Sequence, residues 1–215
     1  MQQPFCCSHV KESSPFLQSV YTHENINLKI SLSENGNGAV YIRWGKKTCP
    51  QHNGTELLYS GTMGGGWFSR TSSPAEALCL PHDPDFVTKD SATTDFHWVS
   101  SLYGAEYHSG TGPYNHDVPC AVCRATLSSS VIMIPGKTSC YSGWKTEYFG
   151  RMSASSNYYK ASSQYTCIDE NPDVLEAGGA DKDGYLINPV RAVCGSLRCP
   201  PFYDNALLTC VVCSS

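Results

Sequence analysis

DVPCAVCRA, residues 117–125, is followed near the end of the chain by LLTCVVCSS, residues 207–215, so a Cys-x-x-Cys pair occurs twice in 215 residues. Two such pairs can converge on zinc, one pair can open a helix as a thiol redox centre, or both can form disulfides. The residues that follow the first pair are rich in β-branched side chains and have no helical period, which favours a strand. The chain has 12 cysteines, an even number that is typical of an oxidised framework. We therefore favour disulfides over zinc or redox chemistry.

The two cysteine pairs belong to a longer internal repeat. Three further segments match at a similar spacing: GKKTC ending at Cys49 with GKTSC ending at Cys140, YSGTM at 59–63 with YFGRM at 148–152, and CLPHDPD from Cys79 with CIDENPD from Cys167. Four landmarks in one order, about 90 residues apart, indicate a tandem duplication. We predict repeat unit one at 39–124 and repeat unit two at 125–215, packed as one globular domain with pseudo-twofold symmetry. Residues 1–38 are then an N-terminal extension or linker.

The composition predicts an all-β, disulfide-rich fold. Hydrophobic residues make up 40% of the chain and charged residues 16%, which is ample for a packed core. Gly, Pro, Ser, Thr and Tyr are plentiful, and no segment has the period of an amphipathic helix. Short segments bounded by Gly, Pro or Ser are expected to be strands: 39–44, 56–61, 130–135, 145–150 and 207–212.

Charge and cysteine content limit the partners and the location. The formal net charge is −4, and Lys and Arg are scattered singly, which argues against nucleic acid as a partner. The longest apolar run, SVIMI at 130–134, is too short to cross a bilayer. The cysteines predict a secreted, extracellular protein, and because no signal peptide is visible we take the sequence as a mature or trimmed form. The sequon NGT makes Asn53 a candidate glycosylation site.

Several long segments carry a family resemblance. AVYIRWGKKTCP, CLPHDPDF, YGAEY, DVPCAVCR, IMIPGKTSCYSGW, CGSLRCPPF and LTCVVCSS resemble the globular domain of invertebrate short-chain, spongin-type collagens over about residues 39–215. More remotely, CAVC and CYSGW are similar to the carboxy-terminal non-collagenous domain of type IV collagen, which is also a tandem duplication. Cysteine spacing alone leaves three pairings open for each set of four. The resemblance implies the pairs Cys49–Cys123, Cys79–Cys120, Cys140–Cys213, Cys167–Cys210 and Cys194–Cys199.

Two features depart from these collagens. The chain has no Gly-X-Y run, so it cannot form a collagen triple helix by itself. Cys6 and Cys7 lie outside the shared pattern, and their pairing is left open. Because the type IV collagen domains form trimers and hexamers, the resemblance implies a homo-oligomer or a contact with other matrix proteins.

Two loops carry candidate ligand-binding aromatics. GTMGGGWFSR places Trp67 and Phe68 after three glycines, and the corresponding loop of unit two offers Tyr158 and Tyr159. Rings on loops can stack on a sugar or on a partner protein, and burial between the units is an equal alternative. Four histidines of unit one, His82, His97, His108 and His116, could serve a transition metal, but loop positions without helical pairing favour plain exposure.

The segment ADKDGYL at 180–186 has the first spacing of a calcium loop. Asp181 and Asp183 alternate before a glycine, and calcium prefers such oxygen ligands. The remaining ligands of that loop are missing, so a plain Asp-Gly turn is the favoured interpretation and calcium the alternative.

No enzyme motif is present. The sequence lacks G-x-S-x-G, H-E-x-x-H, a phosphate-binding glycine loop and a dinucleotide fingerprint, so we predict that the protein is not an enzyme and needs no cofactor. Two functions are expected. The first is an extracellular assembly domain of a collagen-related matrix or adhesive protein, self-associating through strand edges and aromatic loops. The second is a secreted, lectin-like module that binds carbohydrate, with calcium as a possible aid.

Overall fold

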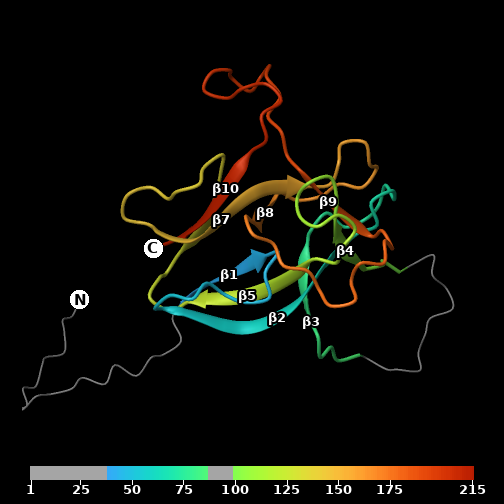
Figure 1. Cartoon of the computed structure of the whole chain (residues 1–215), viewed down its shortest axis with the longest axis horizontal. Helices are drawn as coiled ribbons and strands as arrows, with labels where there is room; N and C mark the ends of the chain where they lie inside the picture. Colours follow the sequence, from blue (N-terminus) through green and yellow to red (C-terminus); the bar gives the residue numbers. More distant parts are fainter. Residues whose placement is uncertain (1–37, 87–98) are drawn as a thin grey trace, which may run out of the picture. The chain divides into compact units, whose positions relative to one another are not determined.

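Ten β-strands form the regular structure of residues 38–86 and 99–215, the part of the chain that the computed structural model describes (Figure 1). Their bounds are β1 Ala39–Trp44, β2 Thr55–Gly65, β3 Leu78–Pro81, β4 Tyr103–Tyr107, β5 Pro119–Ala125, β6 Val131–Pro135, β7 Lys145–Ala154, β8 Thr166–Asp169, β9 Tyr185–Pro189 and β10 Thr209–Ser214. No helix occurs in these two ranges, and thus none that could span a membrane. The all-β prediction is confirmed. The five segments expected as strands lie on β1, β2, β6, β7 and β10.

Several sequence predictions fall outside the described residues. These are the extension 1–38, apart from Gly38, with Cys6 and Cys7, and the candidate metal ligand His97.

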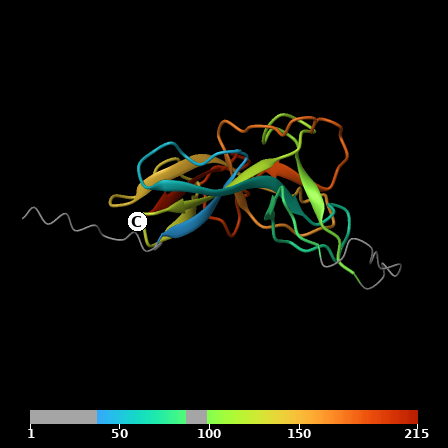
Figure 2. The same cartoon turned by 90° about the horizontal axis from the view of Figure 1, so that it is seen from below.

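The two halves of the chain share one strand-pairing scheme. In the first half β5 lies between β1 and β2, and β2 also pairs with β3 and β4. In the second half β10 lies between β6 and β7, and β7 also pairs with β8 and β9. Figures 1 and 2 show the long strands β2 and β7 in their two sets of neighbours. This scheme is what the repeated sequence leads one to expect; descent of the halves from one duplicated unit stays a prediction.

A glycine at the same repeat position in each half allows the backbone of a long strand to lie close to that of a short neighbour, β2 to β3 and β7 to β8. Gly61 of YSGTM and Gly150 of YFGRM correspond in the repeat. A Cβ added at Gly61 would lie 2.0 Å from the carbonyl oxygen of Leu80, and one at Gly150 would lie 1.8 Å from that of Ile168. Only glycine permits this approach of the two backbones.

The halves join to close a barrel. β1 pairs with β8 in parallel at Trp44 and Ile168, and β4 pairs with β9 in parallel along their centres. Together with the pairing of β7 and β9, these contacts complete a ring of seven strands in the order β7, β8, β1, β5, β2, β4, β9. β10 and β6 extend the sheet from β7, and β3 extends it from β2.

Strand pairing departs from twofold symmetry at one contact. The strands that correspond to β1 and β8 are β6 and β3, and symmetry would require them to pair with each other. Within residues 38–86 and 99–215, β6 pairs only with β10 and β3 pairs only with β2. Each of these two strands therefore has one edge without a strand partner in that part of the chain.

Both buried hydrophobic clusters of the described residues contain side chains from the two halves. One buried cluster joins Trp44, Met63 and Tyr107 of unit one to Ile168 and Tyr185 of unit two. The other cluster joins a second set of side chains from both units: Tyr41, Cys49, Ala121, Cys123, Ala125, Tyr148, Met152, Cys167, Cys210 and Val212. Because burial of apolar surface drives folding, the two units are expected to fold together.

Five disulfides occur among the described residues, and four of them join a strand to another strand or to a loop. They join Cys49 to Cys123, Cys79 to Cys120, Cys140 to Cys213, Cys167 to Cys210 and Cys194 to Cys199. These are the pairs that the resemblance implied. The first two link β5 to the loop before β2 and to β3, and the next two make the equivalent links from β10. The Cys-x-x-Cys pairs therefore anchor the central strand of each half.

A buried carboxylate, that of Glu147, joins the two units through hydrogen bonds. The Glu147 side chain has no exposed surface, and it accepts hydrogen bonds at 2.7 Å from the hydroxyls of Tyr41 and Ser214. His52 Nε2 lies 3.3 Å and Lys145 Nζ 3.6 Å from its oxygens. Burial raises the pKa of Glu147, but these hydrogen bonds and neighbouring groups outweigh it and hold the pKa below its usual range.

Candidate functional site

Six aromatic rings lie in consecutive contact across the two units, and we call them the aromatic strip. In order they are Tyr103, Trp67, Phe68, Tyr159, His108 and Tyr114. The ring centroids of successive members are 4.9, 5.4, 4.8, 6.4 and 5.0 Å apart. Tyr114 is exposed and the other five rings are half-buried, so the strip offers partly open ring surface.

Backbone hydrogen bonds hold the two central loops of the strip together. Phe68 N donates to Gly184 O at 2.9 Å, and Ala161 N donates to Phe68 O at 3.0 Å. The loop after β2 is thus tied to the loop before β9 and to the loop that carries Tyr159. Trp67 is fixed further, since its Nε1 donates to the Ser69 hydroxyl at 2.8 Å. The strip is therefore formed before any ligand arrives.

His108 is positioned by hydrogen bonds on both ring nitrogens. Nδ1 lies 3.0 Å from Asn188 Oδ1 and 2.8 Å from the Ser109 hydroxyl, and Nε2 lies 3.2 Å from the Tyr114 hydroxyl. Asn188 is buried, and its Nδ2 has no hydrogen-bond partner within the described ranges.

An acidic loop, residues 178–184, forms one rim of the strip. Burial raises the pKa of the Tyr159 hydroxyl, and the nearby carboxylate of Asp183 adds to the shift. Beneath the loop, buried Glu106 accepts a 2.7 Å hydrogen bond from Lys182 N. Burial also raises the pKa of Glu106, and its second oxygen has no hydrogen-bond partner in the part of the chain that the structure covers.

A small hollow lies at the Tyr103 end of the strip. It has a volume of about 290 Å³ and is lined by Arg70, Ser72, Ser73, Pro74, Val99, Ser100, Ser101 and Tyr103. Four serines and one arginine thus line a hollow that shares Tyr103 with the strip. We call it the serine hollow.

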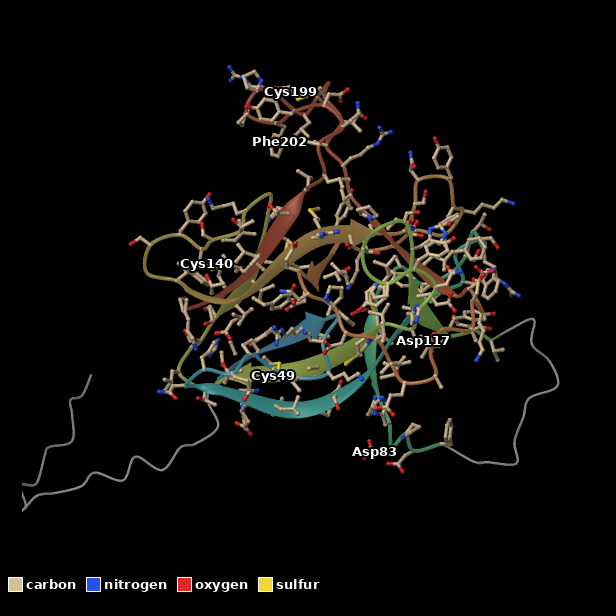
Figure 3. The ribbon with its side chains drawn as sticks, in the orientation of Figure 1. Cys49, Asp83, Asp117, Cys140, Cys199 and Phe202 are labelled. Atoms are coloured by element: carbon tan, nitrogen blue, oxygen red, sulfur yellow. A yellow bond between two sulfur atoms is a disulfide. The ribbon has the colours of Figure 1, made fainter. Side chains whose placement is uncertain are left out.

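A second feature, which we call the arm, is the segment between β9 and β10, residues 190–208. Its two sides are joined by backbone hydrogen bonds from Ala192 N to Ala206 O and from Asn205 N to Ala192 O, both 2.9 Å long. The Cys194–Cys199 disulfide closes its tip. Figure 1 shows the arm extending beyond β10, and Figure 3 labels Cys199 and Phe202 on it.

An apolar groove lies where the arm meets the end of β6. Its volume is about 520 Å³, and it is lined by Ile134, Pro135, Gly136, Lys137, Tyr141, Ala192, Pro201, Phe202, Tyr203, Ala206 and Leu208. The arm also exposes large apolar side chains: Val193, Tyr203 and Leu207 are 59%, 74% and 63% exposed. Exposed apolar surface beside an apolar groove is typical of a contact with another protein.

The structure brings three of the four predicted ligand-binding aromatics together. Trp67, Phe68 and Tyr159 are neighbours in the aromatic strip, whereas Tyr158 is 89% exposed and is not part of it. The strip further includes Tyr103, His108 and Tyr114, which the sequence did not single out as ring partners. Their only signal in the sequence was the aromatic content of YGAEYHSGTGPY.

The candidate metal residues do not form a cluster. Asp181 and Asp183 are exposed, and both have a positive φ, as residues of a turn do. Within residues 38–86 and 99–215 there is no group of three or more His, Cys, Asp or Glu side chains that could hold a metal ion. Asn53 is exposed in the turn before β2.

A scan against protein-family models finds no family that matches this chain.

Proposed function

We propose that this protein is a secreted, non-catalytic assembly domain of a collagen-related matrix or adhesive protein, which self-associates through the arm and the free edge of β6. Five disulfides are compatible with an extracellular location, because such bonds persist in oxidising compartments. The resemblance to the globular domain of spongin-type collagens supports the collagen-related part of the proposal.

The free strand edges carry the proposal. β1 has β5 on one side and β8 on the other, whereas its counterpart β6 pairs only with β10 among the described strands. An open edge presents unpaired backbone groups that favour pairing with another chain. Ile132 on β6 is 42% exposed, so the edge is also partly apolar.

The arm supplies a second contact next to that edge. Ile134 and Pro135 of β6 line the same groove as Phe202 and Tyr203 of the arm. A partner that pairs with β6 would therefore also cover apolar side chains of the arm. Aromatic residues at such a place are the usual anchors of protein interfaces.

The contact would join unlike surfaces of two copies. Since β8 pairs with β1 inside the chain, its counterpart β3 is the strand that would meet β6 of a second copy. Such a head-to-tail contact forms a ring if the rotation closes, and a filament if it does not. A closed trimer is the state that we expect, with a hexamer formed from two trimers.

The mass of the native, unreduced protein tests the proposal. Size exclusion with light scattering, with and without chloride and calcium, should give a trimer or a hexamer. Tyr203→Asp should reduce the mass to that of a monomer, because a charge would enter the apolar groove. The matched control Tyr158→Asp changes an exposed tyrosine away from the arm and should leave the mass unchanged. A monomer under every condition, or assembly that is insensitive to Tyr203→Asp, would contradict the proposal.

A further inference from the structure

The aromatic strip and the serine hollow form one continuous surface with two kinds of chemistry. The strip supplies partly exposed surface of six rings, which are tilted or edge-on to one another, and four serines line the hollow at its Tyr103 end. Ring faces attract apolar C–H surface, and hydroxyls exchange hydrogen bonds with other hydroxyls. A sugar ring has both properties, an apolar face and a hydroxyl-bearing edge.

We propose that this surface binds a neutral oligosaccharide, with successive sugar rings stacked along the strip and one end in the serine hollow. This inference rests on other observations than self-association does, because the rings of the strip come from β4 and from the β2–β3, β4–β5 and β7–β8 loops, whereas the proposed contact uses β6, the arm and the edge of β3. It makes the carbohydrate-binding function expected from the sequence specific: the ligand lies on the strip and in the serine hollow, and it carries no charge.

The succession of ring contacts favours a chain-like ligand. Five consecutive contacts with centroid distances between 4.8 and 6.4 Å give a row of rings and not one isolated stacking residue. The row crosses both units, since Tyr159 comes from the β7–β8 loop and its neighbours Phe68 and His108 come from unit one. Several sugars could therefore contact the protein at once, each through a small stacking energy.

The charges around the strip favour a neutral ligand. Asp181 and Asp183 are exposed on the acidic loop, with Lys182 between them. Carboxylates accept hydrogen bonds from sugar hydroxyls, and these two offset the charges of Lys182 and Arg70, so the surface lacks the excess positive charge that a sulfated or carboxylated chain requires. Among the described residues that line the serine hollow, Arg70 is the one with a charge, and it can donate to a ring or hydroxyl oxygen of a sugar. Its volume of about 290 Å³ is near the lower end of ligand pockets, which suits one sugar residue.

The rings of the strip are held in place before binding, which lowers the entropic cost of binding a ligand. Backbone hydrogen bonds hold Phe68 between the other two loops, and Trp67 is tied to Ser69. The Cys79–Cys120 and Cys167–Cys210 disulfides fix the short strands that pair with β2 and β7. Little side-chain entropy is therefore lost when a ligand stacks on the rings.

Titration of the full chain with defined saccharides tests the inference. The probes are chitohexaose and cellohexaose as neutral chains, a heparin hexasaccharide as the anionic control, and an oligoproline peptide as the competing class of ligand. We expect a change in Trp fluorescence and a calorimetric binding signal with at least one neutral chain, and neither with heparin.

Variants locate the site. Trp67→Ala and Tyr159→Ala should each weaken binding by about tenfold or more, the loss that one stacking contact of about 1.4 kcal/mol produces. Tyr158→Ala is the matched control, because its ring is exposed next to Tyr159 in sequence but outside the strip, and it should bind as the parent does. If Trp67→Ala does not fold, Ser101→Val removes a hydroxyl of the hollow without touching the rings and should also weaken binding.

Three results would overturn the inference. They are no binding of either neutral chain, binding of heparin or oligoproline in place of the neutral chains, and equal loss of affinity in Tyr158→Ala and Tyr159→Ala. An assembly-deficient Tyr203→Asp protein that still binds saccharide would separate this site from self-association.

Discussion

The Glu147→Gln substitution tests how the two units are held together. In the native protein the carboxylate accepts hydrogen bonds at 2.7 Å from Tyr41 of unit one and from Ser214 of unit two. A hydrogen bond to a charged acceptor contributes a net ~1.5–3 kcal/mol. Glutamine has the same shape but no charge, and its amide nitrogen donates, so one of the two hydroxyls would have to accept instead of donate and both bonds would lose their charge assistance. We expect the free energy of unfolding at neutral pH to fall by ~2–4 kcal/mol.

The pH dependence of this loss of stability distinguishes the contribution of the Glu147 charge from that of side-chain packing. Because the folded-state pKa of Glu147 lies below its usual range, the charged form stabilises the protein above the unfolded pKa of ~4.3. This contribution is lost as pH falls through the folded pKa, where protonated glutamate resembles glutamine in shape. The difference between the parent and Glu147→Gln should therefore be largest at neutral pH and should shrink in acid.

Denaturant unfolding with intact disulfides, followed by Trp fluorescence from neutral pH into acid, measures both quantities. Glu56→Gln is the control, since Glu56 pairs with Arg124 on the surface and its loss should have little effect. A difference that stays constant with pH would refute the role of the charge. A loss at neutral pH no larger than in the control would refute the role of the two hydrogen bonds.

Three further predictions concern a glycine of β7, the disulfide of the arm and the glycosylation sequon. Gly150→Ala should lower the free energy of unfolding by ~3 kcal/mol or prevent folding, because the added Cβ would clash with the β8 backbone. The control is Gly104→Ala, whose Cβ would have no atom within 4 Å and which should cost far less stability. Thermal unfolding of the two variants measures the difference. The double substitution Cys194→Ser and Cys199→Ser should lower the mass seen by light scattering, since it frees the tip of the arm, while far-UV circular dichroism stays unchanged. Asn53→Gln should remove an N-glycan, seen as a mass decrease, from protein secreted by eukaryotic cells, because Asn53 is exposed.

Strands with several β-branched or long apolar residues could be predicted from the sequence. AVYIRW became β1 with the expected bounds, and VIMIP became β6. The short strands β3, β4, β8 and β9 could not be predicted. Each has only four or five residues, and β8, TCID, is bounded by polar residues, so these strands form because β2 and β7 offer them backbone partners.

The candidate site could be predicted only in part. Loop aromatics were visible in the sequence, but the contact of Phe68 with Tyr159 joins two loops about 90 residues apart in the chain, which are held together by the hydrogen bond from Ala161 N to Phe68 O. Nor could the pattern separate Tyr158 from Tyr159, because a loop has no fixed side-chain period. The role of Glu147 was hidden for another reason. In the repeat it corresponds to Leu58, which is exposed, so the repeat gave no sign of a buried carboxylate.

The ends of the two units meet at one place in the structure. Ala39 N donates to Ser128 O at 2.8 Å, and Ser129 N donates to Ser215 O at 2.7 Å. The start of β1, the turn between the units and the end of β10 are thus neighbours. The order of the units along the chain is therefore exchangeable: a circular permutant that runs 129–215 and then 38–128, joined by a short Gly-Ser linker, should form the same barrel and the same five disulfides. The barrel needs both units, but it does not need one of them to come first.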